Sequence, residues 1–443
     1  MRRIRPRRSP ATPLLLLSWA GAAAVVWLWW RGTPAVAATT ADRLVNAGRI
    51  TGLLAGYAIA LVIAQMARVP ALERRVGSDR VVRWHARSGR YALMLTLAHV
   101  VLILYGYALQ AHTGVVAQTV SVVTGYPDMI EAAVGTLLLL LVGLVSAGAV
   151  RRRMHYETWY YLHLLTYAAV YLAFWHQLTT GDQFVGDAAA RTAWYALYLT
   201  VGALLLWFRV LTPVRLNLRH RMRVEAVVQE APGVVSVLIR GQRLHRLGAE
   251  AGHFFRWRFL TKGLRWTANP YSLSAPPRPD LLRITVKAAG GHSAALAGLR
   301  PGTRVWAEGP YGAMTAARRS RGKVLLLAGG AGITPLRALF ETLPAASGDL
   351  TLLYRARTAE ELALRDELEA IADERGAQLL YAVNSPDGRR PAITAKMLRR
   401  ILPDIARHDV YLCGPPGLAE ESYAALREAG VPHRRIHHES FEF

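Results

Sequence analysis

Residues 84–99 read WHARSGRYALMLTLAH and residues 163–176 read HLLTYAAVYLAFWH, two apolar stretches that each carry a histidine near either end. The histidines are 14 positions apart in the first stretch and 13 positions apart in the second. In an α-helix these spacings correspond to about 21 Å and about 20 Å of rise. Both stretches therefore predict a helix with one imidazole toward each end.

The four histidines of these stretches are His85, His99, His163 and His176. A single histidine in an apolar helix is commonly a polar residue bonded to a neighbouring helix, and structural histidines are the alternative here too. Four histidines in two similarly spaced pairs instead predict two layers, with His85 and His163 at one level and His99 and His176 at the other. Each layer can hold one heme iron between two imidazoles.

The second spacing fits this arrangement less well than the first. Fourteen residues of helix return to within about 40° of the starting face, whereas thirteen residues miss it by about 140°. The helix over 163–176 must therefore bend, carry a local bulge or present its two rings from different edges.

Apolar segments of roughly 20 residues, the length that crosses a bilayer core, recur in the first half of the chain. The first could be a cleavable leader, but its long apolar run, closed by Trp27–Trp30, favours a retained helix. The residues 1–215 are predicted to form a six-helix transmembrane domain. Its segments are expected at about 12–30, 48–67, 84–107, 129–150, 157–178 and 192–211.

Arginine is dense in alternate loops between these segments. It is frequent at the N-terminus and in 68–83, 151–153 and 209–223, whereas the loop over 108–128 has none. Short basic loops stay on the cytoplasmic side of a membrane. This pattern predicts a multi-pass protein of the cell membrane, with both termini and the domains after residue 215 in the cytoplasm.

The net charge of +24 lies largely in those loops, so no nucleic-acid partner is expected. Cys413 is the only cysteine, which excludes a disulfide within the chain and an iron–sulfur cluster held by several thiolates. A heme would be held non-covalently, because no Cys-x-x-Cys-His motif is present.

The histidine constellation resembles the ferric reductase and NADPH oxidase superfamily of six-helix transmembrane domains. In that family, paired histidines on the third and fifth helices bind two b-type hemes. The resemblance implies that His85 and His163 hold an inner heme iron, and that His99 and His176 hold an outer one.

After the apolar half, the pattern changes twice. Short alternating strands separated by Gly/Pro turns over 221–312 predict a small antiparallel β-barrel. From 323 onward strands alternate with helices, which predicts a parallel, Rossmann-like α/β sheet. The order resembles the ferredoxin–NADP reductase module, and it implies a barrel that binds FAD over 216–318 and an NAD(P)-binding domain over 319–443.

Three stretches match the flavin-binding elements of that module. The resemblance places Tyr271 against the isoalloxazine ring and Ser272 near its reactive edge, and it stacks the terminal Phe443 on the ring. Glycines followed by Ser293 at a helix start also expose backbone N–H groups to a phosphate. The implied FAD-binding residues are Asn269, Pro270, Tyr271, Ser272, Leu273, Val286, Lys287, Gly291, His292, Ser293 and Phe443.

Residues 329–335 read GGAGITP, follow a predicted strand and open a predicted helix, which is the setting of a phosphate-binding loop. Arg355 and Arg357 end the next strand, where a 2′-phosphate would sit, so NADPH is favoured over NADH. The sequence CGPP at 413–416 matches the nicotinamide-side motif of the family. The expected nucleotide-binding residues are Gly330, Gly332, Thr334, Arg355, Arg357, Cys413, Gly414 and Pro415.

Together these features predict a transmembrane oxidoreductase that moves electrons from cytoplasmic NAD(P)H through FAD and two b-type hemes to an external acceptor. The acceptor is dioxygen, which gives superoxide, a ferric chelate, or a periplasmic redox protein. No residue is assigned a catalytic role. Two alternatives stay open: a membrane-anchored flavoprotein reductase that serves a protein redox partner, and a heme-free transporter or sensor with a nucleotide-binding domain.

Overall fold

The computed structural model describes residues 12–33, 39–154, 156–385 and 387–439, so Phe443 lies outside the described residues. The chain divides into two compact units. The helical unit contains the described residues up to Val69 together with Arg80–Arg209. The α/β unit contains Pro70–Asp79 and the chain from Val210 onward.

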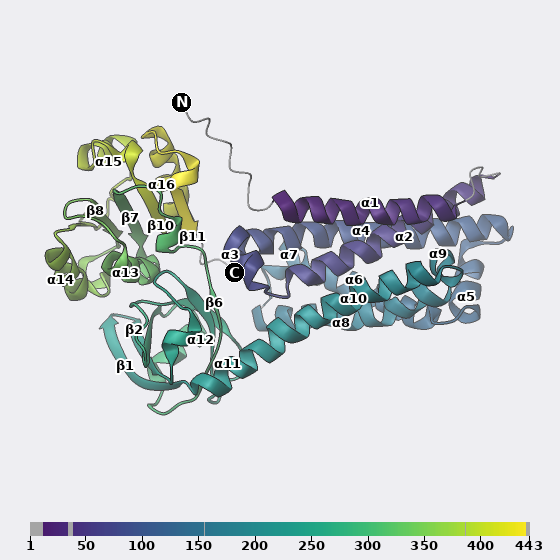
Figure 1. Ribbon diagram of the computed structural model, residues 1–443, viewed down its shortest axis with the longest axis horizontal. Helices are drawn as coiled ribbons and strands as arrows, with labels where there is room; N and C mark the ends of the chain where they lie inside the picture. The colour runs from purple at the N-terminus through teal and green to yellow at the C-terminus, as the bar shows by residue number, and fades with distance from the viewer. Residues whose placement is uncertain (1–11, 34–38, 155, 386, 440–443) are drawn as a thin grey trace. The chain divides into compact units, whose positions relative to one another are not determined.

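Long helices build the helical unit (Figure 1). They are α1 (Thr12–Gly32), α2 (Thr40–Gln65), α4 (Ser78–Gln110), α6 (Met129–Ser146), α8 (Tyr156–Thr179) and α10 (Ala188–Leu205). Shorter helices lie between them: α5 (Val115–Gly125), α7 (Gly148–Arg151) and α9 (Asp182–Val185). The start of α2 is stabilised by a local capping box. In α2, Thr39 Oγ1 accepts from the Asp42 backbone N–H while Asp42 accepts from the Thr39 backbone N–H.

Five helices in the described ranges are long and apolar enough to cross a membrane. They are Thr12–Gly32, Thr40–Gln65, Arg80–Gln110, Met129–Ser146 and Ala188–His220. The predicted segment 157–178 does form a helix, the 24-residue α8, but α8 does not belong to this group. Its many tyrosine, tryptophan and histidine side chains lower its hydropathy. The six predicted spans are therefore not confirmed by length and composition.

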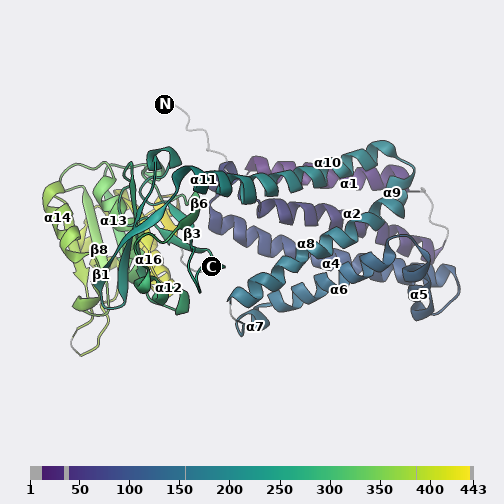
Figure 2. The same cartoon turned by 90° about the horizontal axis from the view of Figure 1, so that it is seen from below.

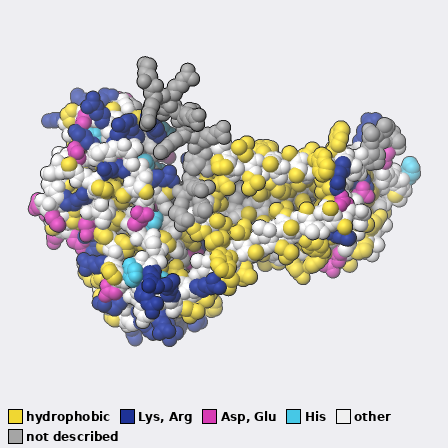
Figure 3. Space-filling view, in the orientation of Figure 1, with side chains coloured by type: hydrophobic (Ala, Val, Ile, Leu, Met, Phe, Trp, Pro, Cys, Tyr) yellow, Lys and Arg dark blue, Asp and Glu magenta, His cyan; other side chains and the backbone are white. Residues whose placement is uncertain are grey.

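Apolar side chains cover much of the visible face of the helical unit (Figure 3). Leu17, Leu137 and Leu199 are 71%, 66% and 69% exposed, as expected of side chains that face lipid. Inside the bundle, small residues allow close approach of helices. A Cβ added to Gly135 on α6 would lie 2.7 Å from the Ala169 carbonyl oxygen on α8, and the two helices lie side by side (Figure 1, Figure 2).

The first part of the α/β unit contains two three-stranded antiparallel sheets. One has the order β1 (Arg223–Ala231), β2 (Val234–Arg240), β5 (Leu281–Lys287). The other has the order β4 (Asn269–Ser272), β3 (Phe254–Phe259), β6 (Val305–Tyr311). Only isolated bridges, Arg223 with Arg304 and Leu273 with Ile284, join them within the described ranges. The predicted β-barrel is therefore not confirmed as a closed barrel, although both sheets contribute to one core.

Short helices flank these sheets: α3 (Pro70–Val76), α11 (Thr212–His220) and α12 (Gly291–Ala295). The side chain of Asn217 fixes α11 to β6. Its Nδ2 donates to the Ala307 carbonyl at 3.0 Å, and its Oδ1 accepts from the Ala307 N–H at 2.8 Å. Both polar groups of this buried amide are therefore satisfied.

The second part is a five-stranded parallel sheet in the order β11-β10-β7-β8-β9. The strands are β7 (Val324–Gly329), β8 (Leu350–Arg355), β9 (Gln378–Ala382), β10 (Asp409–Cys413) and β11 (Ile436–Glu439). The helices α13 (Ile333–Thr342) and α14 (Arg365–Arg375) contribute to one core cluster, and α15 (Ala395–Ile401) and α16 (Pro416–Glu428) to another. The strand order reverses between β7 and β10, and ligands bind such sheets at the carboxyl ends beside this point.

Replacing Gly135 by alanine tests the packing of α6 on α8. The new Cβ would meet the Ala169 carbonyl oxygen, so we expect the melting temperature of the detergent-solubilised protein to fall, with a loss of about 1–3 kcal/mol. Gly202→Ala on α10 is the control, because nothing lies within 4 Å of its added Cβ. Equal melting temperatures for the two variants would contradict this packing.

Candidate functional site

His85 on α4 and His163 on α8 face each other in the helical unit. Their ring centroids are 6.0 Å apart and their planes make an angle of 72°. The Nδ1 atom of His85 lies 3.1 Å from the Val62 carbonyl oxygen on α2, and that of His163 lies 3.1 Å from Ser146 Oγ on α6. Each Nδ1 is thus engaged by a neighbouring helix, which fixes the ring and leaves Nε2 as the nitrogen for a ligand.

His99 on α4 and His176 on α8 make up the second predicted layer. The Nδ1 atom of His99 lies 2.8 Å from the Gly48 carbonyl oxygen on α2. A Cβ on Gly52 would lie 2.5 Å from the same nitrogen, so the ring fills the space above a glycine. The Nδ1 atom of His176 is buried with no hydrogen-bond partner among the described residues. A buried polar atom in this condition costs free energy unless a ligand or water satisfies it.

The 13-residue spacing on α8 is accommodated without a bulge. Helix α8 is α-helical from Tyr156 to Thr179, with no π or 3₁₀ turn. The two histidines consequently leave the helix from different edges. Trp159 stacks on the His163 ring, with centroids 5.1 Å apart, and helps to hold it.

The donor set of these layers fits iron held in a porphyrin better than a bare metal ion. No group of three or more His, Cys, Asp or Glu side chains that could hold a metal ion occurs among the described residues. A porphyrin supplies the other nitrogens, so two imidazoles suffice. His85 and His163, whose ring centroids are 6.0 Å apart, would be the two imidazoles that hold such an iron.

The α/β unit contains a small pocket between its antiparallel sheets and its parallel sheet. The loop predicted to bind phosphate supplies Gly330, Ala331 and Thr334, and Thr334 Oγ1 donates to the Thr285 carbonyl at 3.2 Å. The other lining residues are Val234, Thr285, Lys287, Ile333, Tyr354, Glu361 and Ala363.

The loop and the end of β10 approach closely beside this pocket. A Cβ on Gly332 would lie 2.0 Å from the Cys413 carbonyl oxygen and 2.8 Å from the Gly414 nitrogen. Gly330 adopts φ +53°, a conformation that favours glycine. The predicted nucleotide residues from two distant segments are thus brought together at the point where the strand order reverses.

The predicted flavin residues divide into two groups. Tyr271 on β4 and His292 on α12 stack at 27°, and the Tyr271 hydroxyl lies 3.2 Å from His292 Nδ1. Burial raises the pKa of Tyr271 to about 12, so its hydroxyl stays protonated. Leu273 and Val286, by contrast, are core residues with 0% and 3% exposure.

Ser293 has a local structural role. Its hydroxyl oxygen accepts from the backbone N–H groups of Ala289 and Gly290, at 2.9 and 3.0 Å. The serine thus caps the glycine loop itself, and two of the loop N–H groups already have an acceptor.

The two arginines predicted at a 2′-phosphate have different surroundings. Arg355 is buried, and its Nη1 donates to Glu421 on α16 at 3.0 Å. Arg357 is exposed, and its Nη2 lies 2.8 Å from Glu361, four residues further on. The sequence interpretation missed Glu361 as a pocket residue, although its spacing from Arg357 is that of a helical ion pair.

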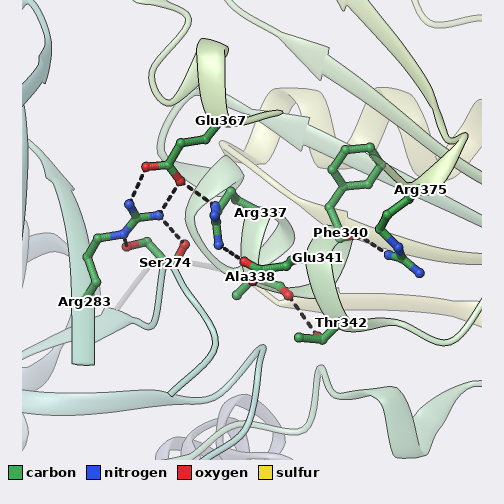
Figure 4. A network of polar contacts seen from close by, with 9 residues as sticks. All are labelled: Ser274, Arg283, Arg337, Ala338, Phe340, Glu341, Thr342, Glu367 and Arg375. Carbon is green, nitrogen blue, oxygen red and sulfur yellow. Dashed lines mark hydrogen bonds and ion pairs between the residues drawn. The ribbon is translucent and has the colours of Figure 1, made fainter. Parts of the chain in front are cut away.

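A network of charged side chains holds the two parts of the α/β unit together (Figure 4). Arg283 on β5 donates to both carboxylate oxygens of Glu367 on α14, at 2.5 and 2.8 Å. Arg337 on α13, which is buried, lies 2.8 Å from the same carboxylate and also pairs with Glu341. The pocket walls therefore come from parts that are tied by a partly buried ion-pair network.

Two family profiles match this chain. Residues 51–174 match "Ferric reductase like transmembrane component", which includes His85, His99 and His163, and residues 326–423 match "Oxidoreductase NAD-binding domain". The predicted fusion of these two parts is thereby confirmed.

The curated relatives align with only part of this chain. It is 30% identical over 224 residues to "Stachydrine N-demethylase reductase subunit Stc4" of Rhizobium meliloti, covering 48% of this chain and 64% of the relative. It is 30% identical over 199 residues to "Plasma membrane-associated coenzyme Q6 reductase PGA3" of Saccharomyces cerevisiae, covering 42% and 64%. The chain thus spans less than two thirds of either relative.

Among solved structures, the FAD/NAD-binding domain of a nitric oxide dioxygenase from Vibrio cholerae is similar to half of this chain. The identity is 24%, the TM-score is 0.42, and the match covers 50% of this chain and 98% of the other.

The variant Glu367→Gln tests the ion-pair network of Arg283, Arg337 and Glu367 through the pH dependence of protein stability. Burial works to raise the pKa of the Glu367 carboxyl, but the bonds from Arg283 and the charge of Arg337 outweigh it and lower the pKa from its ordinary value of 4.5. A group with a lowered pKa stabilises the folded state above its unfolded pKa and loses this effect as the pH falls through the folded value. We expect the variant to lose about 1–2 kcal/mol at pH 7, a modest figure because the carboxylate is partly exposed.

Melting curves of wild type and variant should converge as the pH is lowered below 4.5. Asp387→Asn, which removes an exposed pair with Arg389, is the control and should change little at any pH. A difference between wild type and Glu367→Gln that does not depend on pH would contradict the assignment.

Proposed function

Because this chain is a membrane-associated oxidoreductase that joins a ferric reductase-like transmembrane domain to an oxidoreductase NAD-binding domain, we propose that it moves electrons across the membrane. The electrons come from cytoplasmic NAD(P)H and pass through FAD and two b-type hemes to an external acceptor. The observation that carries the proposal is the facing pair His85 and His163, with each Nδ1 held by another helix.

When bound, the nicotinamide supplies hydride, the flavin takes two electrons and releases them singly, and each heme iron takes one electron at a time. The chain's own residues would hold these groups. His85 and His163 would ligate one iron and His99 and His176 the other, with α2 and α6 setting the orientation of three of the four rings. Fixed rings keep the carriers in place without further rearrangement.

On the nucleotide side, the α/β unit would position two ligands against each other. The Tyr271–His292 stack supplies aromatic surface for the flavin, and Lys287 supplies positive charge next to the pocket. The loop at 330–334 would receive the nucleotide phosphates, with the Thr334–Thr285 hydrogen bond holding its helix to β5. The bond between Thr334 and β5 thus sets the distance between the two binding sites.

The basic loops support an orientation with both termini and the α/β unit in the cytoplasm. Electrons then move outward, and an inside-negative potential assists each electron by about 2.3 kcal/mol per 100 mV. The outer acceptor is dioxygen, a ferric chelate or a periplasmic redox protein, each of which needs only access to the outer carrier.

A second candidate is a membrane-anchored reductase that serves a protein partner on the cytoplasmic side. Two relatives favour it, since one is a reductase subunit and another is a membrane-associated coenzyme Q6 reductase. This reductase would not need His99 or His176.

His99→Ala separates the two functions. We reconstitute the full-length protein in vesicles with a ferric chelate trapped inside, and add NADPH outside to the molecules whose α/β unit faces outward. Loss of one iron ligand should lower the rate of trapped-chelate reduction on the order of 100-fold, while flavin reduction by NADPH stays unchanged.

His112→Ala is the matched control, because this histidine is exposed and lies beyond the end of α4. It should keep the wild-type rate. Transfer to the trapped acceptor that survives His99→Ala would contradict the transmembrane route and favour the anchored reductase.

A further inference from the structure

Glu361 places a carboxylate in the nucleotide pocket. It ends the 3₁₀ turn Ala359–Glu361 that follows β8, and it lines the same cavity as Gly330, Thr334 and Lys287. Phosphates are expected in this cavity, and a negatively charged side chain is not complementary in charge to a phosphate.

Both cations near this carboxylate are already paired with it. Lys287 Nζ on β5 lies 3.3 Å from Glu361 Oε2, and Arg357 Nη2 lies 2.8 Å from Glu361 Oε1. The hydrogen bond from Arg357, followed by that from Lys287, lowers the pKa of Glu361 against the opposing effect of burial. The carboxylate is therefore ionised at neutral pH, and it neutralises the two cations.

These pairs are suited to exchange. The side chains of Glu361 and Lys287 are 24% and 32% exposed, and that of Arg357 is 74% exposed. Ion pairs with this much solvent contact contribute about 1 kcal/mol or less. An incoming dianionic group can consequently replace the carboxylate at small cost.

We propose that Glu361 is an internal competitor for the nucleotide phosphates: in the empty pocket it pairs with Arg357 and with Lys287 of the predicted flavin element, and it is displaced from Arg357 when a dinucleotide with a 2′-phosphate binds. The proposal rests on the proposed function, because it needs the nucleotide at this pocket. The proposal gives Glu361 a role that lowers the affinity for the nucleotide, whereas the residues predicted from the sequence all raise this affinity.

The competitor has a consequence for selectivity. A dinucleotide would contact the glycine loop and Arg357 together, so it can displace the carboxylate. Inorganic phosphate has only the charge interaction, and it has to compete with a carboxylate that is tethered in place at high effective concentration. Glu361 therefore excludes small anions while it admits the dinucleotide.

Calorimetric titration of the full-length, flavin-loaded protein in detergent tests this inference. NADP⁺ is titrated into wild type and Glu361→Gln at low salt, with and without inorganic phosphate. The glutamine keeps the side-chain length but not the charge, so we expect the Kd for NADP⁺ to fall about two- to fivefold. Inorganic phosphate should weaken NADP⁺ binding to the variant more than to wild type.

Glu369→Gln is the matched control. It also removes an i,i+4 pair with arginine, at 2.8 Å from Arg365, but Glu369 does not line the pocket. Its Kd should equal that of wild type. Glu361→Asp keeps the charge and should stay close to the wild-type Kd.

Equal or weaker NADP⁺ binding by Glu361→Gln, with an unchanged melting temperature, would overturn the competitor role alone and leave the proposed electron route intact. If Glu361→Gln lowers the melting temperature, its Kd for NADP⁺ is compared with that of Glu361→Asp. The competitor role requires the uncharged variant to bind NADP⁺ more tightly than the charged one. Wild type that binds neither NADP⁺ nor NAD⁺ would overturn both the competitor and the proposed function.

Discussion

The arrangement of the helical unit depends on imidazole nitrogens that are held by neighbouring helices inside an apolar environment. A polar ring in such surroundings is costly unless it is bonded. His85 and His99 meet this requirement with carbonyl oxygens of α2, and His163 meets it with Ser146 of α6. These bonds link α4 and α8 to two other helices and engage Nδ1 of three of the four rings. The two layers are thus a property of at least four helices.

In the α/β unit, charged side chains connect the parts of the structure in a similar way. Arg283, Glu367 and Arg337 connect the antiparallel sheets to α13 and α14, and Lys287 reaches across to Glu361. Lys287 and Glu361 line the pocket, and the contacts differ in exposure. The network around the buried Arg337 is suited to hold the two parts together, whereas the exposed pairs of Glu361 are suited to exchange. Structure and binding are therefore served by different ion pairs within a short stretch of chain.

Much of the fold and of the candidate site could be predicted from the sequence, because these features depend on local periodicity and spacing. The histidine pairs, the glycine loop before α13 and the parallel sheet are all marked by patterns within a few dozen residues. Features that depend on pairing between distant segments could not be predicted. One example is the pair of antiparallel sheets, which are joined by isolated bridges and not by a continuous strand ladder. Another is the contact of Lys287 with the carboxylate of Glu361, which lies 74 positions further along the chain. The sequence did predict helix α8 as a span, but its tyrosine, tryptophan and histidine side chains lower its hydropathy, so length and composition do not confirm it as one.

The central claim is that four imidazoles hold two iron porphyrins, one above the other. It is tested most directly by electron paramagnetic resonance of the oxidised full-length protein, combined with a heme count per chain. The account predicts two hemes per chain, each with the low-spin ferric signal of two imidazole ligands. Fewer than two hemes in protein that was well supplied with heme, or a high-spin signal from either iron, would contradict it.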